Sequence, residues 1–376
     1  MREEMLAVQK RHEDAQCVHG GAYSVDRDLV RLDFSSSVSP LGAPPAAIEA
    51  IRKRAGELAS EYPDPQCKQL RASLCKYLGG VNEDQLCIGN GAIELIHWFA
   101  QTFVRGKVLV PAPTFCEYEL ASRRTGAVVV PVPLERTSDG SFELDPEAIL
   151  SAARGASALF LCNPNNPTGQ TLPPKDIERI LSELPGTMVL LDECFIELSS
   201  RPQVSFSGRT GEFANLVVLR SMTKSFALAG LRLGYSISNV KTAERLDAKR
   251  IHWNVNGLAQ AAGVAALQSA RKYLASARAL ISRERSYMRK IFESGGLGSY
   301  HPMPSEANFF LVGLSPVHSS GSKFRDRLLK KTGVLVRDCS TFAGMGDGYI
   351  RVAVKSHEQN VELLKSLRKM EHGADG

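Results

Sequence analysis

The sequence predicts an α/β protein with a large three-layer domain on a mostly parallel sheet and a smaller α+β carboxy-terminal domain. Short runs that are apolar on both faces alternate with amphipathic helical segments, a pattern typical of a buried parallel sheet covered by helices. At 376 residues the chain exceeds one typical core, so two domains are expected. We expect an amino-terminal segment over residues 1–44, which covers the active site and packs on the small domain. The large domain is expected over 45–255 and the small domain over 256–376.

The large domain is expected to contain five buried strands with helices between them. Each strand is a short apolar run, most of them rich in valine or leucine. Apolar residues at helical spacing predict covering helices over residues 93–103 and 174–184. The expected strands are residues 107–110, 127–130, 158–161, 187–191 and 216–219.

The small domain is expected to differ from the large one in its element order. It opens with a long Ala-rich helix over residues 258–292. Its last helix carries Val361, Leu364 and Leu367 on one face. Between the two helices, apolar runs predict three strands, at residues 308–312, 333–336 and 349–354.

Composition and charge indicate an ordinary globular protein. Hydrophobic residues make up 43% of the chain and charged residues 23%, and the net charge is +6. The basic clusters at residues 283–285 and 323–327 alternate with acids, which is typical of solvated helix faces and argues against nucleic-acid binding. No apolar run approaches the ~20 residues that cross a bilayer, and residues 1–5 lack the apolar core of a signal peptide. We therefore expect a cytoplasmic protein without a membrane partner.

The eight cysteines are predicted to be buried free thiols. They form no Cys-x-x-Cys pair and have no clustered histidine partners, and some adjoin apolar runs, as Cys162 does. The eight histidines are scattered along the chain. We therefore favour neither disulfides nor a metal site.

The segment Ser221-Met222-Thr223-Lys224-Ser225-Phe226 places one lysine among small hydroxyl residues, and Arg232 follows a short loop later. An amine can form an imine with an aldehyde, while hydroxyl groups and a guanidinium bind a phosphate dianion. Taken alone, the segment fits an exposed Ser/Thr-rich turn equally well. The residues suited to hold a phosphorylated aldehyde are Ser221, Thr223, Lys224 and Arg232.

Two further loops are candidates for the same ligand. Asn90-Gly91-Ala92 opens the helix over residues 93–103, where free backbone N–H groups attract an anion and Gly91 permits close approach. Phe115 follows the strand at 107–110 and can stack on a planar pyridine ring. A plain helix start and a core phenylalanine are the alternatives for these two loops.

Two loops at the ends of buried strands are more specific. Asn163-Pro164-Asn165-Asn166-Pro167-Thr168-Gly169 is fixed by two prolines and a glycine, so Asn166 can present its amide to a phenolic oxygen. Asp192 ends the strand at 187–191, where a carboxylate is costly unless paired, and a protonated pyridine nitrogen is a natural partner. A structural acid that caps a helix is the alternative for Asp192. Because ligands bind at the carboxyl edge of parallel sheets, these loops together predict a site for pyridoxal 5′-phosphate.

Three more residues are candidates for ligand contacts. Tyr62 precedes the first long helix of the large domain, and an ordinary turn tyrosine is the alternative. Arg337 and Arg351 each lie in what reads as an edge strand. Two arginines near a cofactor suit a dianionic substrate through bidentate contacts, with surface salt bridges as the alternative for each.

With these motifs in this order, the chain resembles the fold-type I pyridoxal-phosphate enzymes of the class I/II aminotransferase group over roughly residues 19–367. The resemblance implies a homodimer with its active sites at the subunit interface, where Tyr62 reaches the cofactor phosphate of the neighbouring subunit. It implies that Lys224 is the Schiff-base lysine. It also implies that Asp192 pairs with the ring nitrogen and Asn166 with the phenolic oxygen.

Two branches of this group fit the chain. Histidinol-phosphate aminotransferases share its Tyr-Pro-Asp-Pro, Asn-Pro-Asn-Asn-Pro-Thr-Gly and lysine motifs. The chain is more similar to the L-threonine-O-3-phosphate decarboxylases, which form (R)-1-amino-2-propanol O-phosphate for cobalamin biosynthesis. That likeness rests on His19-Gly20-Gly21, on Asp33-Phe34-Ser35 and on Phe195, where aminotransferases usually carry a tyrosine. The substrate contacts that it implies are His19, Gly20, Ser35, Asn166, Arg337 and Arg351.

One departure from the decarboxylase pattern lies just after Ser35. The decarboxylases usually have two asparagines where this chain has Ser37 and Ser39, which are shorter donors and acceptors. A non-enzymatic protein on this fold is not expected, because Lys224 and Asp192 are both retained. We therefore expect a lyase that acts on a small phosphorylated amino acid.

Overall fold

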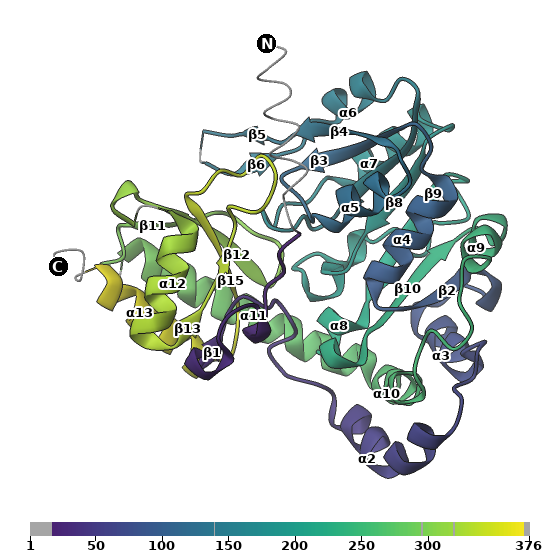
Figure 1. Cartoon of the computed structure of the whole chain (residues 1–376), viewed down its shortest axis with the longest axis horizontal. Helices are drawn as coiled ribbons and strands as arrows, with labels where there is room; N and C mark the ends of the chain where they lie inside the picture. Colours follow the sequence, from purple (N-terminus) through teal and green to yellow (C-terminus); the bar gives the residue numbers. More distant parts are fainter. Residues whose placement is uncertain (1–16, 139, 295, 319, 372–376) are drawn as a thin grey trace.

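The computed structural model describes residues 17–371 except 139, 295 and 319. Figure 1 shows two lobes, a larger one that holds a seven-stranded sheet and a smaller one that holds a four-stranded sheet. The long helix α11 (Ala270–Ser294) runs between them. Residues 1–5, where we expect no signal peptide, lie outside the described residues. Among the described helices, none combines the length and the apolar character needed to span a membrane.

The large sheet is mostly parallel, as predicted. Its strand order is β2-β10-β9-β8-β7-β3-β4, and β10 alone runs antiparallel to its neighbours within this sheet. All five predicted strands are confirmed. The strands are β2 (Leu86–Asn90), β3 (Lys107–Ala112), β4 (Val128–Pro133), β7 (Ala156–Cys162), β8 (Met188–Asp192), β9 (Leu216–Ser221) and β10 (Leu233–Ser238).

Two strands of this sheet, β2 and β10, are not predicted by the sequence pattern. The strand β10 reads Leu-Gly-Tyr-Ser-Ile-Ser, which looks half-exposed, yet every one of its residues is buried. Its glycine has a packing role, since a Cβ at Gly234 would lie 2.6 Å from the backbone nitrogen of Ala92. The antiparallel strand therefore lies tightly against the first turn of helix α4 (Ala92–Phe103).

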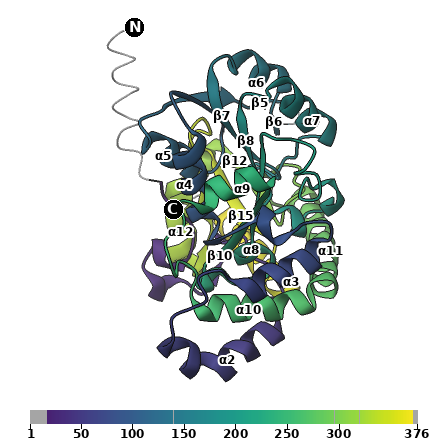
Figure 2. The ribbon, with the colours of Figure 1, turned by 90° about the vertical axis from the view of Figure 1, so that its right-hand side faces the viewer.

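Alternate residues of the central strands face opposite helical layers. Phe160 and Leu190 belong to the core beneath α4, α5 and α9, whereas Leu161 and Leu191 belong to the core beneath α3, α6, α7 and α10. In Figure 2, α5 and α7 lie on opposite sides of β7 and β8, which confirms the three-layer arrangement. The other helices of these layers are α3 (Lys68–Leu78), α5 (Glu117–Arg123), α6 (Pro146–Ala152), α7 (Pro174–Glu183), α9 (Val240–Asp247) and α10 (Gly257–Gln268).

The small sheet is antiparallel throughout, with the strand order β11-β12-β15-β14. One face packs Phe310, Ile350 and Val352 into a core shared with α11, α12 and α13. The strands predicted at 308–312 and 349–354 and the last helix are confirmed. The elements are β11 (Tyr300–Pro302), β12 (Phe309–Leu314), β14 (Arg337–Asp338), β15 (Tyr349–Ala353), α12 (Gly321–Thr332) and α13 (His357–Glu371).

The single helix predicted over residues 258–292 is wrong, because the segment forms two helices, α10 and α11. Ser269 lies between them with a φ angle of −116°. Its carbonyl oxygen accepts the amide of Tyr273 in α11 at 3.0 Å. Serine competes with regular helical bonding and favours helix ends, so a break at this position has a local cause.

Two strand predictions in the small lobe also need correction. The run at 333–336 forms β13 (Val334–Leu335), which pairs in parallel with β1 (Leu32–Asp33) and not with the four-stranded sheet. Arg351 lies on β15, which is flanked by β12 and β14, so it does not lie on an edge strand. Because β13 pairs with β1, the amino-terminal segment is tied to the small lobe.

After β1, the chain crosses to the large lobe, where α2 (Pro45–Ser60) packs on α10. The predicted domain boundaries after residues 44 and 255 remain predictions. The remaining short elements are β5 (Glu135–Arg136), β6 (Phe142–Glu143), α8 (Met222–Ser225), η1 (Ala22–Ser24), η2 (Arg27–Leu29), η3 (Glu83–Gln85), η4 (Ile196–Leu198), η5 (Pro202–Val204), η6 (Ala229–Leu231) and η7 (Pro316–His318).

Candidate active site

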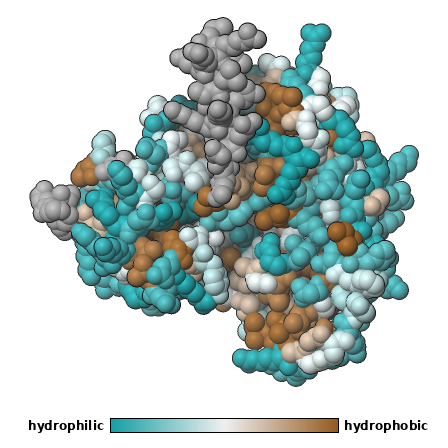
Figure 3. Space-filling model, viewed as in Figure 1, coloured by the Kyte–Doolittle hydropathy of each residue, from teal (hydrophilic) through white to brown (hydrophobic). Residues whose placement is uncertain are grey.

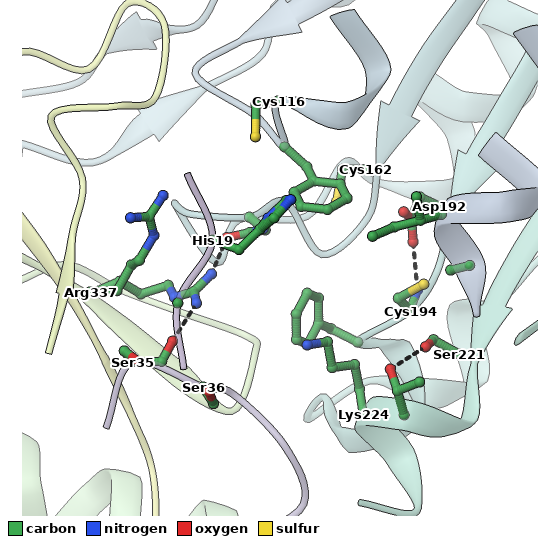
Figure 4. Close-up of a pocket in the computed structure, with 18 of the residues that line it drawn as sticks. His19, Ser35, Ser36, Cys116, Cys162, Asp192, Cys194, Ser221, Lys224 and Arg337 are labelled. Carbon is green, nitrogen blue, oxygen red and sulfur yellow. Dashed lines mark hydrogen bonds between the residues drawn. The ribbon is translucent and has the colours of Figure 1, made fainter. Parts of the chain in front are cut away.

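A cavity of about 330 Å³ is lined by residues of the large sheet, the small sheet and the amino-terminal segment. Figure 4 shows Lys224 and Arg337 on opposite sides of it. All of the predicted site residues except Gly91 and Tyr62 line the cavity. The lining residues that were predicted are His19, Gly20, Ser35, Ala92, Phe115, Asn166, Asp192, Ser221, Thr223, Lys224, Arg232, Arg337 and Arg351.

Lys224 lies in the one-turn helix α8, directly after strand β9 ends. Its backbone oxygen accepts the amide of Ser39 at 2.9 Å, which fixes the turn. Its amine has no hydrogen bond or ion pair with any described residue. The pKa of Lys224 is lowered from 10.5 to about 8, chiefly by burial and also by the nearby guanidinium groups of Arg351 and Arg232. The amine is therefore easily deprotonated and able to act as a nucleophile.

A buried ionic cluster packs next to the turn that carries Lys224. Arg220 of β9 contacts Glu193 at 2.9 Å and Glu197 at 3.1 Å, and all three side chains are at most 6% exposed. The hydroxyl of Ser225, next to Lys224, lies 2.5 Å from a carboxylate oxygen of Glu197 and 2.9 Å from the backbone oxygen of Ser221, and these two acceptors share its single proton. Sequence reasoning missed this cluster. The signal was an arginine inside an apolar strand, which is costly unless it is paired.

Asp192 ends strand β8, as predicted, and is 4% exposed. Its carboxylate accepts the hydroxyl of Tyr118 at 2.7 Å and the backbone amide of Cys194 at 2.8 Å. Burial raises the pKa of Asp192, while these two donors act in the opposite direction. Tyr118 and Cys194 line the cavity too, and neither contact was predicted from the sequence.

The loop at residues 163–169 is joined to the loop before Phe115. Thr114 donates to the side-chain oxygen of Asn165 at 2.7 Å, and the Asn165 amide donates to the backbone oxygen of Pro113 at 3.0 Å. The peptide bonds before Pro113, Pro164 and Pro167 are cis. Asn165 therefore joins the two loops, whereas its neighbour Asn166 lines the cavity.

Arg337 and Arg351 line the side of the cavity formed by the small sheet. Arg351 donates to the backbone oxygen of Ser35 at 2.8 Å and to the side-chain oxygen of Asn166. Its Nε atom is buried without a partner in the described part of the chain. Burial lowers the pKa of Arg351 to about 10, so the guanidinium stays charged at neutral pH. Arg337 donates to the backbone oxygen of Val18 and to Thr341, the latter at 2.8 Å.

Gly91 and Arg232 form a close contact at the start of α4. Gly91 has a φ angle of +82°, and a Cβ at this position would collide with the Arg232 guanidinium. Arg232 itself has a left-handed backbone with a φ angle of +59°. Ser221 and Thr223, which line the cavity together with Arg232, are joined by a hydrogen bond of 2.6 Å. Together they form a cradle suited to an anion, with the free N–H groups of α4 at its base.

Tyr62 lies outside the cavity of its own chain. Its side chain is 81% exposed and stacks on Trp253, with a distance of 4.6 Å between ring centroids. The role that the family resemblance implies for it, a contact across a dimer interface, remains a prediction.

The prediction of free thiols is wrong for Cys17 and Cys116, which form a disulfide. The other six cysteines are free. Cys17, His19 and Cys116 also place their ligand atoms within 4.8 Å of one another, so the expectation of no cysteine–histidine cluster is wrong here. The two cysteines are 99 residues apart in sequence, and only the fold brings them together.

The fold is that of the pyridoxal-phosphate-dependent enzymes of fold type I. Residues 31–367 match the family model for class I and II aminotransferases, and the chain belongs to that family. Pyridoxal 5′-phosphate is the cofactor of this family and is bound in solved structures of it.

The most similar relatives divide between two activities. The chain is 34% identical to a protein of Caldanaerobacter subterraneus with the provisional name threonine-phosphate decarboxylase, over 93% of both chains. It is 35% identical to the histidinol-phosphate aminotransferase of Symbiobacterium thermophilum, over 91% of this chain and 90% of that one. The solved L-threonine-O-3-phosphate decarboxylase of Porphyromonas gingivalis is 25% identical with a TM-score of 0.79, over 91% of this chain and 99% of that one.

The residues of the cavity fit pyridoxal 5′-phosphate. The unpaired amine of Lys224 suits its aldehyde, and the contact between Gly91 and Arg232 leaves a cradle for its phosphate. The lining set contains four cationic side chains and one carboxylate, so the cavity favours anions. The carboxylate, Asp192, suits a protonated ring nitrogen.

Proposed function

We propose that this enzyme removes CO2 from L-threonine O-3-phosphate and forms (R)-1-amino-2-propanol O-phosphate, a reaction of cobalamin biosynthesis. The observation that carries the proposal is Phe195. Its ring lines the cavity, 6.0 Å from the Lys224 amine, and packs edge-on against Phe309. Aminotransferases of this group usually have a tyrosine here, whose hydroxyl bonds the phenolic oxygen of the cofactor. Phe195 supplies no such donor, as in the decarboxylases.

The proposed roles of the cofactor-binding residues follow from their positions. Lys224 would hold the cofactor at its carbonyl and Asp192 would pair with the ring nitrogen, while Tyr118 and the Cys194 amide keep the Asp192 carboxylate oriented. Asn166 lines the cavity and would contact the phenolic oxygen. The residues proposed to bind the phosphate are Gly91, Ala92, Ser221, Thr223 and Arg232, and Phe115 is proposed to stack on the ring.

When bound, pyridoxal phosphate supplies an electron sink for the electron pair left at the substrate Cα after bond cleavage. Which bond at Cα breaks depends on how the substrate is oriented, so the groups that hold its anionic ends decide the reaction. Arg337 and Arg351 are proposed to bind these ends, together with His19, Gly20 and Ser35, which lie beside them in the cavity lining. The proton that replaces CO2 at Cα comes from Lys224 or an ordered water, and a pKa of about 8 suits Lys224 to this transfer.

The alternative activity is histidinol-phosphate aminotransferase, because a relative with that name is as similar in identity as the decarboxylase. The two reactions differ in their second substrate, since transamination needs 2-oxoglutarate and decarboxylation needs no acceptor. We expect kcat/KM for threonine phosphate to exceed that for histidinol phosphate by at least about 100-fold. The opposite order, with glutamate as a product, would support the aminotransferase.

We also propose that the enzyme is a homodimer. Tyr62, Ile251 and Trp253 are large apolar or aromatic side chains with 81%, 72% and 49% of their surface exposed. Figure 3 shows apolar residues gathered at the lower end of the molecule, where Figure 1 places α2. An exposed apolar surface of this kind suits a subunit interface. Sedimentation equilibrium should give twice the 41.0 kDa chain mass, whereas a mass of one chain would rule the dimer out.

A further inference from the structure

The disulfide between Cys17 and Cys116 lies at the wall of the active-site cavity. Cys116 lines the cavity, and so do Val18, His19 and Gly20, the three residues that follow Cys17. Figure 4 shows His19 and Cys116 on neighbouring parts of this wall. The disulfide therefore ties a piece of the cavity wall to the residue that precedes helix α5.

The segment of residues 17–20 belongs to no helix or strand, and a few contacts hold it in place. On the large-lobe side, His19 contacts Glu117 with an Nε2 to Oε1 distance of 2.8 Å. On the small-lobe side, Arg337 donates to the backbone oxygen of Val18. Gly20 lies close to the segment that follows β1, because a Cβ on it would lie 2.7 Å from the backbone oxygen of Ser35. The segment thus crosses from one lobe to the other over the cavity, and the disulfide is its covalent attachment to the large lobe.

The two cysteines have suitable neighbours for thiol chemistry. Both cysteines are partly exposed. The His19 Nε2 atom lies 3.8 Å from the Cys17 sulfur, and a Glu117 oxygen lies 3.5 Å from it. A thiolate is the form that attacks a disulfide, and an adjacent imidazole can accept the thiol proton.

We propose that Cys17 and Cys116 form a reversible thiol–disulfide pair that controls how tightly residues 17–20 cover the cavity. Oxidation joins the two sulfurs and removes two protons and two electrons, which a small disulfide such as oxidised glutathione takes up as it splits into two thiols. A dithiol reverses the reaction. In the oxidised form the wall is fixed and the bound phosphorylated substrate is retained. In the reduced form only the noncovalent contacts remain, so the wall opens and substrate escapes faster. The nature of that substrate rests on the proposed function.

The first test counts thiols by alkylation under denaturing conditions and intact mass. Wild-type protein treated with oxidised glutathione should show six reactive thiols, and after dithiothreitol it should show eight. Cys116→Ser cannot form the bond. Cys75→Ser is the matched control, because Cys75 is a partly buried free cysteine on α3 outside the cavity lining. The Cys75→Ser variant should lose two reactive thiols on oxidation, as the wild type does.

The second test measures separately how mobile residues 17–20 are and how the KM for substrate changes. Hydrogen exchange of a peptide covering residues 17–24 should speed up on reduction of the wild type, and it needs no turnover. The KM for threonine phosphate should rise about three- to tenfold on reduction with a smaller change in kcat, and Cys116→Ser should have the reduced value in both conditions. If threonine phosphate is not a substrate at all, the exchange measurement still decides this proposal.

Three results would overturn the proposal that this disulfide controls the cavity wall. Eight reactive thiols after oxidation would show that the pair does not form. Equal hydrogen exchange and equal KM in both redox states would show that the bond does not control the wall. One Zn²⁺ retained per reduced wild-type chain after desalting, and lost in Cys116→Ser, would make Cys17, His19 and Cys116 a metal site instead.

Discussion

Arg337 and Arg351 occupy directly opposed positions on the neighbouring strands β14 and β15, and both reach the active-site cavity. Two guanidinium groups at such positions repel each other unless an anion lies between them. Arg351 also keeps its Nε donor unpaired in a buried position, among the residues that the structure describes. This arrangement is suited to a substrate that carries two anionic groups.

Arg351→Ala should raise KM for the phosphorylated substrate by about 10- to 100-fold, because hydrogen bonds from a charged donor are lost. The change in kcat should be smaller. Steady-state kinetics over substrate concentration measure both. Arg289→Ala is the control, since Arg289 is an arginine of α11 outside the cavity lining. An unchanged KM in Arg351→Ala would contradict the proposed role.

Attachment of the cofactor to the protein should depend on the pKa of Lys224. Only the neutral amine attacks an aldehyde, and burial lowers this pKa from 10.5 to about 8. The rate at which cofactor-free enzyme binds pyridoxal phosphate covalently should therefore rise with pH and level off above about 8. Stopped-flow absorbance measures this rate. A midpoint near 10.5 would show that the amine is not perturbed.

Lys224→Met should abolish turnover and yet stabilise the cofactor-free protein at pH 7. In the wild type, the lowered pKa means that the folded state disfavours the charged amine, at a cost of about 3 kcal/mol when the amine is protonated in both states. That cost is complete below about pH 8 and disappears as the pH rises towards 10.5. Denaturant unfolding at pH 7 and pH 10.5 should show a gain for Lys224→Met that shrinks at the higher pH. If Lys224→Met were less stable than the wild type at pH 7, this explanation would be refuted.

Asp192→Asn should lower kcat by orders of magnitude while the protein keeps its cofactor, since the amide cannot stabilise a positive ring nitrogen. Tyr118→Phe should have a milder effect, about tenfold, because it removes one of the two donors to Asp192. Cofactor content and kcat are measured together for both variants. Equal losses of kcat in the two variants would argue against this order of importance.

The buried cluster of Arg220, Glu193 and Glu197 should be essential for stability. Glu197→Ala removes one partner of a buried ion pair and should cost about 3–5 kcal/mol. Thermal unfolding of the variant measures the loss, with Glu212→Ala as the control because its ion pair with Arg209 is largely exposed. A melting temperature for Glu197→Ala as high as that of the control would show that the cluster is not needed.

Much of the lining of the candidate site could be predicted from the sequence, because these residues lie at the ends of recognisable strands. Lys224, Asp192 and Asn166 follow apolar runs that form β9, β8 and β7, and parallel strands bring their carboxyl ends together.

The contacts between distant segments could not be predicted. The disulfide joins residues 99 positions apart, and the bond between Tyr118 and Asp192 spans 74 positions. Strand β10 was missed because its serines and glycine, all buried, imitate a half-exposed strand. In each case packing determines the contact, and local sequence carries no signal for it.

The most direct test is to supply the pyridoxal-phosphate-loaded enzyme with L-threonine O-3-phosphate labelled with ¹³C at the carboxyl carbon, without any keto acid. We predict steady release of labelled CO2 over many turnovers and an equal amount of 1-amino-2-propanol phosphate. Turnover that stops after one equivalent, or that starts only when 2-oxoglutarate is added and leaves the label in a keto acid, would contradict the decarboxylase.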